Sequence, residues 1–182
     1  YTAAPGTRTG QGRVQVADIT PRVSGQFIAD KVKDNRFVHA GDVLYDLDPF
    51  DFQVAVPPAT ARVSEREGDM TLKTAQEPRR NRLTEIAASQ EEKQLYQATA
   101  EVARAQYAEA MAALSQARIN LDRTHVHSTV TGHVTNLIMA PGDFATAGTP
   151  NVRVINASSY WVDGYFEETK IHAIHVGDRV RL

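Results

Sequence analysis

Apolar and polar residues alternate in two short segments that lie far apart in the chain. These are VSGQF, which begins at Val23, and VTGHV, which begins at Val130. Such alternation, bounded by Gly, Asp and Asn, predicts short strands joined by tight turns. The glycine of each segment is followed sixteen residues later by another, since Gly25 precedes Gly41 and Gly132 precedes Gly148. Apolar positions between these glycines also recur in register: Val32 with Met139, Phe37 with Phe144, and Ala40 with Ala147.

This repeat predicts two halves of a quasi-symmetric β-sandwich, with the four glycines at the turns that define the fold. Each half contains about 30 residues and is too small to bury a core alone.

The region between the halves has a helical composition. Residues 59–122 are rich in Ala, Gln, Glu and Arg and contain one glycine, Gly68. Apolar residues in and just before this region recur seven apart: Val56, Val63 and Met70, then Leu95 and Val102, then Leu114 and Leu121. Alanines fill much of the remaining stripe. We therefore predict an antiparallel coiled-coil hairpin whose two helices pack along these positions.

Prolines and capping residues set the expected ends of the helices. Pro57-Pro58 favours a helix start, and Pro78 should kink or end the first helix. Ser89 with Glu92 three residues later has the spacing of a capping box, so the second helix is expected to run from there to Asp122. The turn of the hairpin should lie between residues 79 and 89.

Composition restricts the kinds of partner. The 182 residues carry 20 Lys and Arg against 22 Asp and Glu, a formal net charge of -2. They show no concentrated basic face, so nucleic acid is not expected as a partner. The lack of cysteine excludes disulfides and cysteine-ligated metals. No apolar run approaches the roughly 20 residues of a membrane-spanning helix. Because the chain begins without Met and stops in the strand-like VGDRVRL, we expect a fragment whose membrane anchor precedes Tyr1.

Histidines and carboxylates are candidates for metal binding or catalysis. His125, His127 and His133 would share one face of a strand pair, and His172 and His175 lie three apart on a short helix. Neither group has a clear carboxylate partner, so we expect no metal site and no cofactor.

The chain is also not expected to be an enzyme. It contains no P-loop and no GxSxG motif. Asp46, Asp48 and Asp51 suit a hairpin junction better than a catalytic carboxylate pair, and Asp51 is a candidate helix cap.

The segment Val23–Asp48 resembles the first half of a lipoyl or biotinyl carrier domain, which presents a modified lysine on a turn between its halves. It contains Asp30-Lys31, but the junction DLDPFDF, where the carrier lysine would lie, has no lysine. Lys31 is therefore expected to be an ordinary surface lysine. A carrier domain of an enzyme complex remains the alternative function.

Four longer pieces resemble the HlyD/EmrA family of membrane fusion proteins, the periplasmic adaptors of bacterial efflux and secretion systems. They are ITPRVSGQF, VKDNRFVHAGDVLYDLDPFDF, INLDRTHVHSTVTGHVTNL and SSYWVDGYFEETKIHAIHVGDRV. The last two are similar to the subgroup of AaeA-like adaptors for p-hydroxybenzoic acid efflux.

This resemblance implies a mixed α+β fold: a lipoyl-like (barrel-sandwich hybrid) β domain split by the antiparallel hairpin, plus the start of a β-barrel domain. The segments are 1–17, an extended N-terminal stretch and candidate barrel strand; 18–50, the first lipoyl-like half; 51–122, the hairpin; 123–156, the second half; and 157–182, the truncated barrel domain.

The resemblance also implies a location and partners. The protein would be periplasmic and anchored to the inner membrane. It would link a transporter, proton-driven rather than ABC, to a TolC-like outer-membrane channel, and would self-associate as trimers or hexamers. A type I secretion adaptor for an ABC transporter is a further alternative.

The hairpin tip is the first candidate contact surface. In the family, an Arg, a Leu four residues later and a Ser seven beyond that contact the channel or a neighbouring tip. Arg79 and Leu83 keep the first spacing, and Ser89 comes one residue early. Arg80 and Arg82 belong to the same candidate surface. The alternative is a solvated charged turn.

The C-terminal segment is the second candidate surface. Trp161 and Phe166 lie in an aromatic strand, and Glu167 and Glu168 open a short helix with acidic residues at its positive end. This face would meet the transporter or a neighbouring adaptor. Barrel core and helix capping are the alternative explanation.

Overall fold

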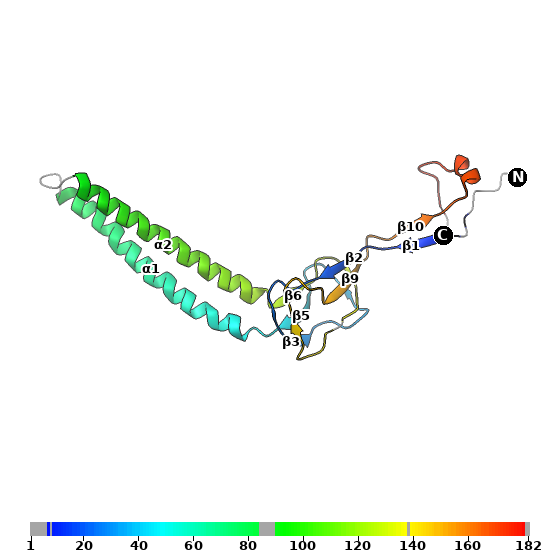
Figure 1. Ribbon diagram of the computed structural model, residues 1–182, viewed down its shortest axis with the longest axis horizontal. Helices are drawn as coiled ribbons and strands as arrows, with labels where there is room; N and C mark the ends of the chain where they lie inside the picture. Colours follow the sequence, from blue (N-terminus) through cyan, green and yellow to red (C-terminus); the bar gives the residue numbers. More distant parts are fainter. Residues whose placement is uncertain (1–6, 8, 84–89, 138, 181–182) are drawn as a thin grey trace.

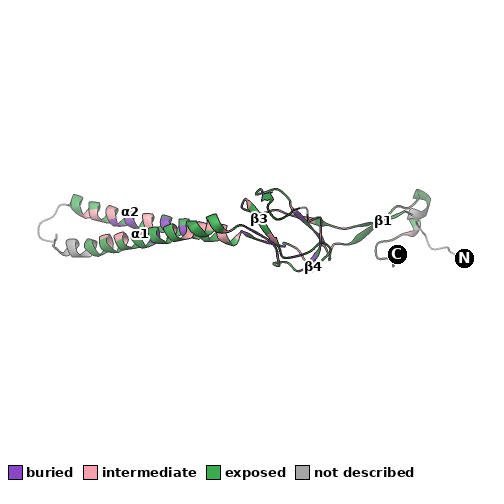
Figure 2. Cartoon of the chain, turned by 90° about the horizontal axis from the view of Figure 1, so that it is seen from below, coloured by how far each residue is buried: buried purple, intermediate pink, exposed green. Residues whose placement is uncertain are grey.

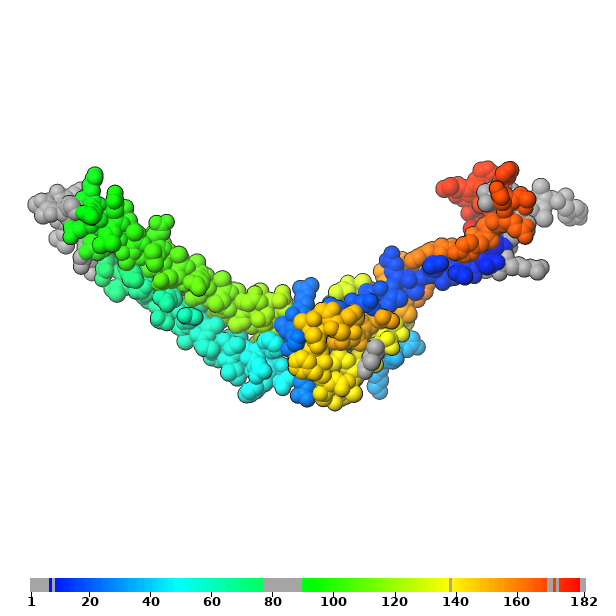
Figure 3. Space-filling view, viewed as in Figure 1, coloured from blue at the N-terminus to red at the C-terminus, as the bar shows by residue number. Residues whose placement is uncertain are grey.

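The chain forms an elongated, bent molecule in which a helical hairpin, a small β-sandwich and a two-stranded ribbon follow one another (Figures 1 and 3). The computed structural model describes residues 7, 9–83, 90–137 and 139–180, with the backbone alone for 77–83, 170, 171 and 173. The sandwich lies in the middle, with the hairpin on one side and the ribbon on the other. None of the helices in the described part of the chain combines the length and apolar content needed to cross a bilayer.

Two four-stranded antiparallel sheets form the sandwich, and they have the same construction. One has the order β2 (Val16–Ile19), β9 (Val152–Asn156), β7 (Gly132–Thr135), β4 (Phe37–Val38). The other has the order β6 (His125–His127), β5 (Val43–Leu47), β3 (Gly25–Asp30), β8 (Phe144–Ala145). Each strand of one sheet has a counterpart at the same place in the other, near the offset that separates Gly25 from Gly132. The predicted quasi-symmetric sandwich is confirmed.

Loop hydrogen bonds repeat with the strands. The N–H of Gly41 donates to the carbonyl of Ser128 at 2.8 Å, and its counterpart Gly148 donates to the carbonyl of Pro21 at 3.0 Å. Both glycines have positive φ, 95° and 83°, which residues with a Cβ adopt only at a cost. Gly25 and Gly132, also predicted at turns, instead begin strands β3 and β7.

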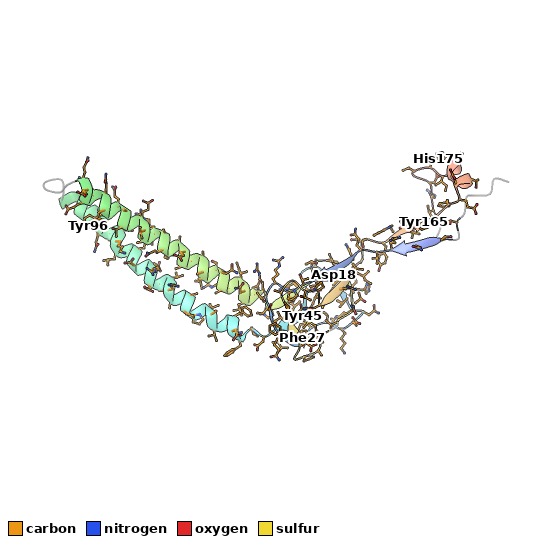
Figure 4. The ribbon with its side chains drawn as sticks, viewed as in Figure 1. Asp18, Phe27, Tyr45, Tyr96, Tyr165 and His175 are labelled. Carbon is orange, nitrogen blue, oxygen red and sulfur yellow. The ribbon has the colours of Figure 1, made fainter. Side chains whose placement is uncertain are left out.

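The hydrophobic core lies between the sheets and is built by both halves of the repeat. Its fully buried side chains include Phe27, Leu44, Tyr45 and Leu47 from the first half, and Val134, Val152 and Val154 from the second. The rings of Phe27 and Tyr45 lie 5.5 Å apart between centroids and are tilted by 49° (Figure 4). Neither half encloses these side chains alone.

Helix α1 (Phe50–Leu83) begins before the prolines that were expected to start it, so that prediction is wrong. Asp48 provides the cap, because its Oδ1 accepts a hydrogen bond from the N–H of Phe50 at 3.0 Å. Phe52 packs against the sandwich core and holds the first turn. Pro57 and Pro58 lie on the exposed side of the helix, where water can reach the carbonyls that they leave without donors.

The other expected helix ends have different outcomes. Helix α1 continues past Pro78 to Leu83, so Pro78 does not end it. Helix α2 (Gln90–Asp122) begins one residue after Ser89, which lies outside the described residues.

The two helices pack along one inner seam with three- and four-residue spacing. Its most buried members are Val63 on α1 and Ala100, Ala103, Ala110 and Leu114 on α2. These residues face the opposite helix, and the outer edges of the hairpin are exposed (Figure 2). The prediction that Leu95 and Val102 share this seam is wrong, because their side chains are 63% and 54% exposed. They belong to a second stripe on α2 that faces solvent.

The ribbon extends from the sandwich on the side opposite the hairpin. Strand β1 (Gly10–Arg13) pairs antiparallel with β10 (Trp161–Gly164), and an ion pair of 2.6 Å joins Arg13 Nε to Asp163 Oδ2. A 3₁₀ helix, η1 (Glu168–Ala173), follows β10. The N-terminal and C-terminal segments therefore form one sheet.

Alanine substitutions at two glycines test how closely the backbone is packed in the sandwich and in the hairpin. A Cβ at Gly132 would lie 1.7 Å from the carbonyl oxygen of Ile155, whereas a Cβ at Gly68 would have nothing within 4 Å. Gly132→Ala should therefore lower the free energy of unfolding by about 2–4 kcal/mol through the backbone shift it forces. Gly68→Ala should raise it by about 0.5–1 kcal/mol through helix propensity. Urea unfolding followed by circular dichroism measures both, and equal effects would contradict this packing.

Candidate functional site at the two necks and the hairpin tip

A charged cluster lies where the chain enters and leaves the hairpin, a region that we call the hairpin neck. Asp46 on β5 and His125 on β6 are cross-strand partners, with Asp46 Oδ1 2.7 Å from His125 Nδ1. The other carboxylate oxygen, Oδ2, lies 3.1 Å from Lys31 Nζ. One residue further towards the helices, the N–H of Leu47 donates to the carbonyl of Thr124 at 2.8 Å. The cluster thus connects both strands at the base of the hairpin.

Asp46 is the most buried member of the cluster. Its side chain is 14% exposed, whereas those of Lys31 and His125 are 53% and 52% exposed. Burial, the largest single effect, acts to raise the pKa of Asp46. Hydrogen bonds from His125 and Lys31, together with the charges of the same two groups, outweigh burial and lower this pKa below its usual value. The carboxylate is therefore stabilised in its charged form.

The opposite end of the sandwich, the ribbon neck, carries a counterpart of this cluster. Asp18 on β2 and Arg153 on β9 are cross-strand partners, and Arg153 Nε lies 2.9 Å from Asp18 Oδ1. In the repeat, Asp18 corresponds to His125 and Arg153 to Asp46, so the pair has the same position with reversed charges. Figure 4 places Asp18 at the end of the sandwich nearest the ribbon. This pair is about half exposed, unlike Asp46.

Several residues considered for cofactor or metal binding have structural partners. Lys31 lies in the bend after β3 and forms the ion pair with Asp46. The Nδ1 of His127 lies 2.8 Å from the carbonyl oxygen of Gly41, and the ring of His133 meets Phe37 edge-on at 5.1 Å. Among the described residues, no three His, Asp or Glu side chains come together in a group that could hold a metal ion.

The predicted tip residues lie at the far end of the hairpin from the sandwich. Arg79, Arg80, Arg82 and Leu83 occupy the last turns of α1, where only the backbone is described. Ser89 lies outside the described residues. Their role in binding stays a prediction.

The predicted C-terminal surface lies on the ribbon. Trp161 begins β10 with 43% of its surface exposed, and Phe166 is half-buried after the strand. Glu167 is exposed, and Glu168 begins η1. The two candidate surfaces, at the ribbon and at the end of the hairpin, therefore lie at opposite ends of the molecule (Figure 1).

Sequence motifs do not predict the two neck pairs, although the internal repeat contains a sign of them. Aligning the two halves of the repeat places Asp18 opposite His125 and Asp46 opposite Arg153. The charges in each half become partners only once the strand register is known. A search for known motifs does not detect this kind of pair.

A pseudo-symmetric sandwich interrupted by a long helical hairpin is the architecture of a barrel-sandwich hybrid domain. Residues 15–157 match the family described as "RND MFP, barrel-sandwich hybrid domain". The chain therefore belongs to the membrane fusion proteins, as its sequence resemblance indicated.

Individual relatives extend the likeness along nearly the whole chain. The uncharacterized protein YdhJ of Escherichia coli (strain K12) is 36% identical over 177 residues, which cover 97% of this chain and 62% of YdhJ. This chain thus spans less than two thirds of that relative's length.

Solved structures share the fold at low identity. A MacA–MexA chimeric protein with the α-hairpin domain of Pseudomonas aeruginosa MexA has a TM-score of 0.65 at 22% identity, covering 93% of this chain and 58% of that one. The periplasmic adaptor protein EmrA has a TM-score of 0.52 at 14% identity, covering 94% and 81%.

Replacing Asp46 tests the hairpin neck. Asp46→Asn removes the ion pair with Lys31 and should lower the free energy of unfolding by about 1–2 kcal/mol at pH 7. Because the folded-state pKa of Asp46 is lowered, its charge contributes stability above the unfolded pKa of about 3.9, and this contribution is lost as pH falls through the folded pKa. The difference between wild type and variant should therefore shrink below about pH 4.

Asp18→Asn at the ribbon neck is the matched control, since it breaks the corresponding but exposed pair. It should change stability by no more than about 0.5 kcal/mol at pH 7. Urea titrations between pH 3 and 7 measure both variants. An equal loss at the two necks would show that burial of Asp46 does not matter.

Proposed function

We propose that this chain is the bridging section of a periplasmic adaptor, anchored to the inner membrane, in a tripartite efflux system. It links an inner-membrane transporter to a TolC-like outer-membrane channel and so exports small molecules such as drugs or aromatic acids. The observation that supports this best is the placement of the hairpin and the ribbon on opposite sides of one sandwich (Figure 1). With 34 and 33 residues, α1 and α2 each extend about 50 Å, at ~1.5 Å per residue, away from the sandwich.

In this role the molecule functions by positioning two contact surfaces at a fixed distance from each other. The sandwich connects two extended arms, and the neck pairs join the strands from which each arm starts. The hairpin points towards the channel, and the ribbon, as the start of a barrel domain, points towards the transporter. Family members are adaptors without enzymatic activity, which agrees with an assignment of no catalytic residues here.

A proton-driven transporter is the partner that we favour. The family description refers to RND systems, which supports this class over the ABC transporters of type I secretion. Self-association into trimers or hexamers would repeat each tip contact around a ring and multiply weak contacts through avidity.

The tip is the proposed contact with the channel, through Arg79, Arg80, Arg82, Leu83 and Ser89. Arg79→Asp combined with Leu83→Asp reverses one charge and adds another at the end of α1. We expect this variant to reduce drug resistance to the level of a strain that lacks the adaptor. Resistance and dye accumulation measure transport, while circular dichroism and protein abundance confirm folding.

Gln76→Asp with Gln97→Asp is the matched control, because both glutamines are exposed nearby on the same hairpin. This control should keep normal resistance. Wild-type resistance in the Arg79 and Leu83 variant would remove the tip from the proposal.

The ribbon is the proposed contact with the transporter or a neighbouring adaptor, through Trp161, Phe166, Glu167 and Glu168. Trp161→Ala removes an exposed aromatic side chain, of the type that often dominates interfaces. We expect at least tenfold less transporter to co-purify with this variant, while Tyr160→Ala, next to it and 64% exposed, should have a smaller effect. Unchanged recovery of the transporter would instead assign Trp161 to the packing of the barrel domain.

A further inference from the structure

His125 and His127 lie two residues apart on β6, and each ring is held through its Nδ1 atom. Asp46 Oδ1 lies 2.7 Å from His125 Nδ1, and the carbonyl oxygen of Gly41 lies 2.8 Å from His127 Nδ1. Val126 between the two histidines is buried, whereas both histidines are exposed, so their side chains project from the same outer face of the strand. This strand lies where the hairpin joins the sandwich (Figure 1).

These two contacts fix the position of the proton on each neutral ring. A carbonyl oxygen can only accept a hydrogen bond, so the neutral ring of His127 carries its proton on Nδ1. The charged carboxylate of Asp46 also only accepts, so the neutral ring of His125 carries its proton on Nδ1 as well. The other ring nitrogen, Nε2, therefore has a free lone pair in both histidines.

A β-bulge in β5 places Asp46 beside His125. The register between β5 and β6 shifts between Val43 and Tyr45, and the adjacent residues Leu44 and Tyr45 are both fully buried. Regular alternation from Leu44 would direct the side chain of Asp46 into the core. The extra residue of the bulge turns it to the outer face instead, which is a recurrent use of bulges next to functional sites.

The two histidines are also open to solvent. Strand β6 lies at one edge of its sheet, next to β5. Both Nδ1 partners come from the β5 side, because Asp46 lies in that strand and Gly41 lies in the turn before it. The side chain of His125 is 52% exposed, and His127 is exposed as well. An ion can therefore reach the two rings without any rearrangement of the core.

Rings held in this way have the arrangement of metal-binding histidines. A hydrogen bond from Nδ1 to a carboxylate or a backbone carbonyl fixes the tautomer, orients the ring and makes Nε2 a more basic ligand. Two residues on one face of a strand have Cα atoms about 7 Å apart, at ~3.3–3.4 Å per residue, so their rings can converge on one ion. Sequence spacing alone did not reveal a carboxylate partner for these histidines, and Asp46 is that partner.

We propose that His125 and His127 bind one divalent transition-metal ion through their Nε2 atoms, with Asp46 and the carbonyl of Gly41 as the groups that orient the rings. Imidazole favours Cu²⁺, Ni²⁺ and Zn²⁺, and Cu²⁺ should bind most tightly. No third His, Asp or Glu completes the ligand set among the residues that the structure describes, so water fills the remaining positions and binding is reversible. The site is additional to the proposed adaptor function and does not depend on it.

Asparagine substitutions remove the ligands and keep the contacts behind them. The amide nitrogen of Asn can donate to the same oxygen as Nδ1 of His, but Asn has no counterpart of Nε2. Cu²⁺ is titrated calorimetrically into the full-length protein, purified without a histidine tag. We expect His125→Asn and His127→Asn each to weaken binding at least tenfold, because each leaves a single imidazole. His172→Asn with His175→Asn, the other closely spaced and exposed pair, is the matched control and should bind like the wild type.

Spectroscopy distinguishes this site from non-specific binding. Above about pH 7.5, where histidine is neutral, ¹⁵N NMR of the metal-free protein should show both rings protonated at Nδ1. Electron paramagnetic resonance of the Cu²⁺ form should show two imidazole nitrogens on one ion.

Asp46→Asn tests the positioning role of the carboxylate. It should weaken Cu²⁺ binding about tenfold although both ligands remain, since such partners change affinity by about 10–100-fold. Circular dichroism checks that each variant is folded. Protonation of either ring at Nε2, wild-type affinity in either single asparagine variant, or an equal loss of affinity in the control pair overturns the proposal.

Discussion

Neither half of the sandwich is complete without the other, and the whole molecule depends on this constraint. Strand β4 of the first half pairs with β7 of the second, and β8 of the second pairs with β3 of the first. The halves thus exchange their short strands as well as sharing a core. Since the hairpin separates them in sequence, α2 must bring the chain back to strand-pairing distance from where α1 began. Helices of 34 and 33 residues do this, and the Leu47–Thr124 hydrogen bond closes the base.

The same symmetry explains why each arm starts from a charged cross-strand pair. The repeat places the hairpin neck and the ribbon neck at corresponding positions. Strands β5 and β6 connect to the hairpin, and β9 and β2 connect to the ribbon. At both necks two strands leave the shared core and no longer have the other strands of the sandwich beside them. The buried Asp46 gives a stronger connection than the exposed Asp18, because an exposed ion pair is screened by water. The hairpin neck thus has the more buried carboxylate of the two.

Sequence patterns predicted the sandwich and the hairpin because both depend on periodicity that a single chain displays. The sixteen-residue glycine spacing reports strand repeats, and the seven-residue spacing reports helices. Spacing alone could not assign Leu95 and Val102 to a face, since two seams that differ by two residues have the same period. The start of α1 was missed for another reason: the cap at Asp48 and the packing of Phe52 outweigh the lost donors of Pro57 and Pro58. The neck clusters depended on strand register, which composition and motifs do not contain.

Some exposed features of the hairpin do not stabilise the single chain. Gly68 costs the isolated helix about 1 kcal/mol relative to alanine, and no described neighbour uses the space it leaves. Leu95 and Val102 remain 63% and 54% exposed, so each contributes much less burial than a core side chain of the same size. In the proposed adaptor function, repetition around a ring would let tip contacts that are weak one at a time act together.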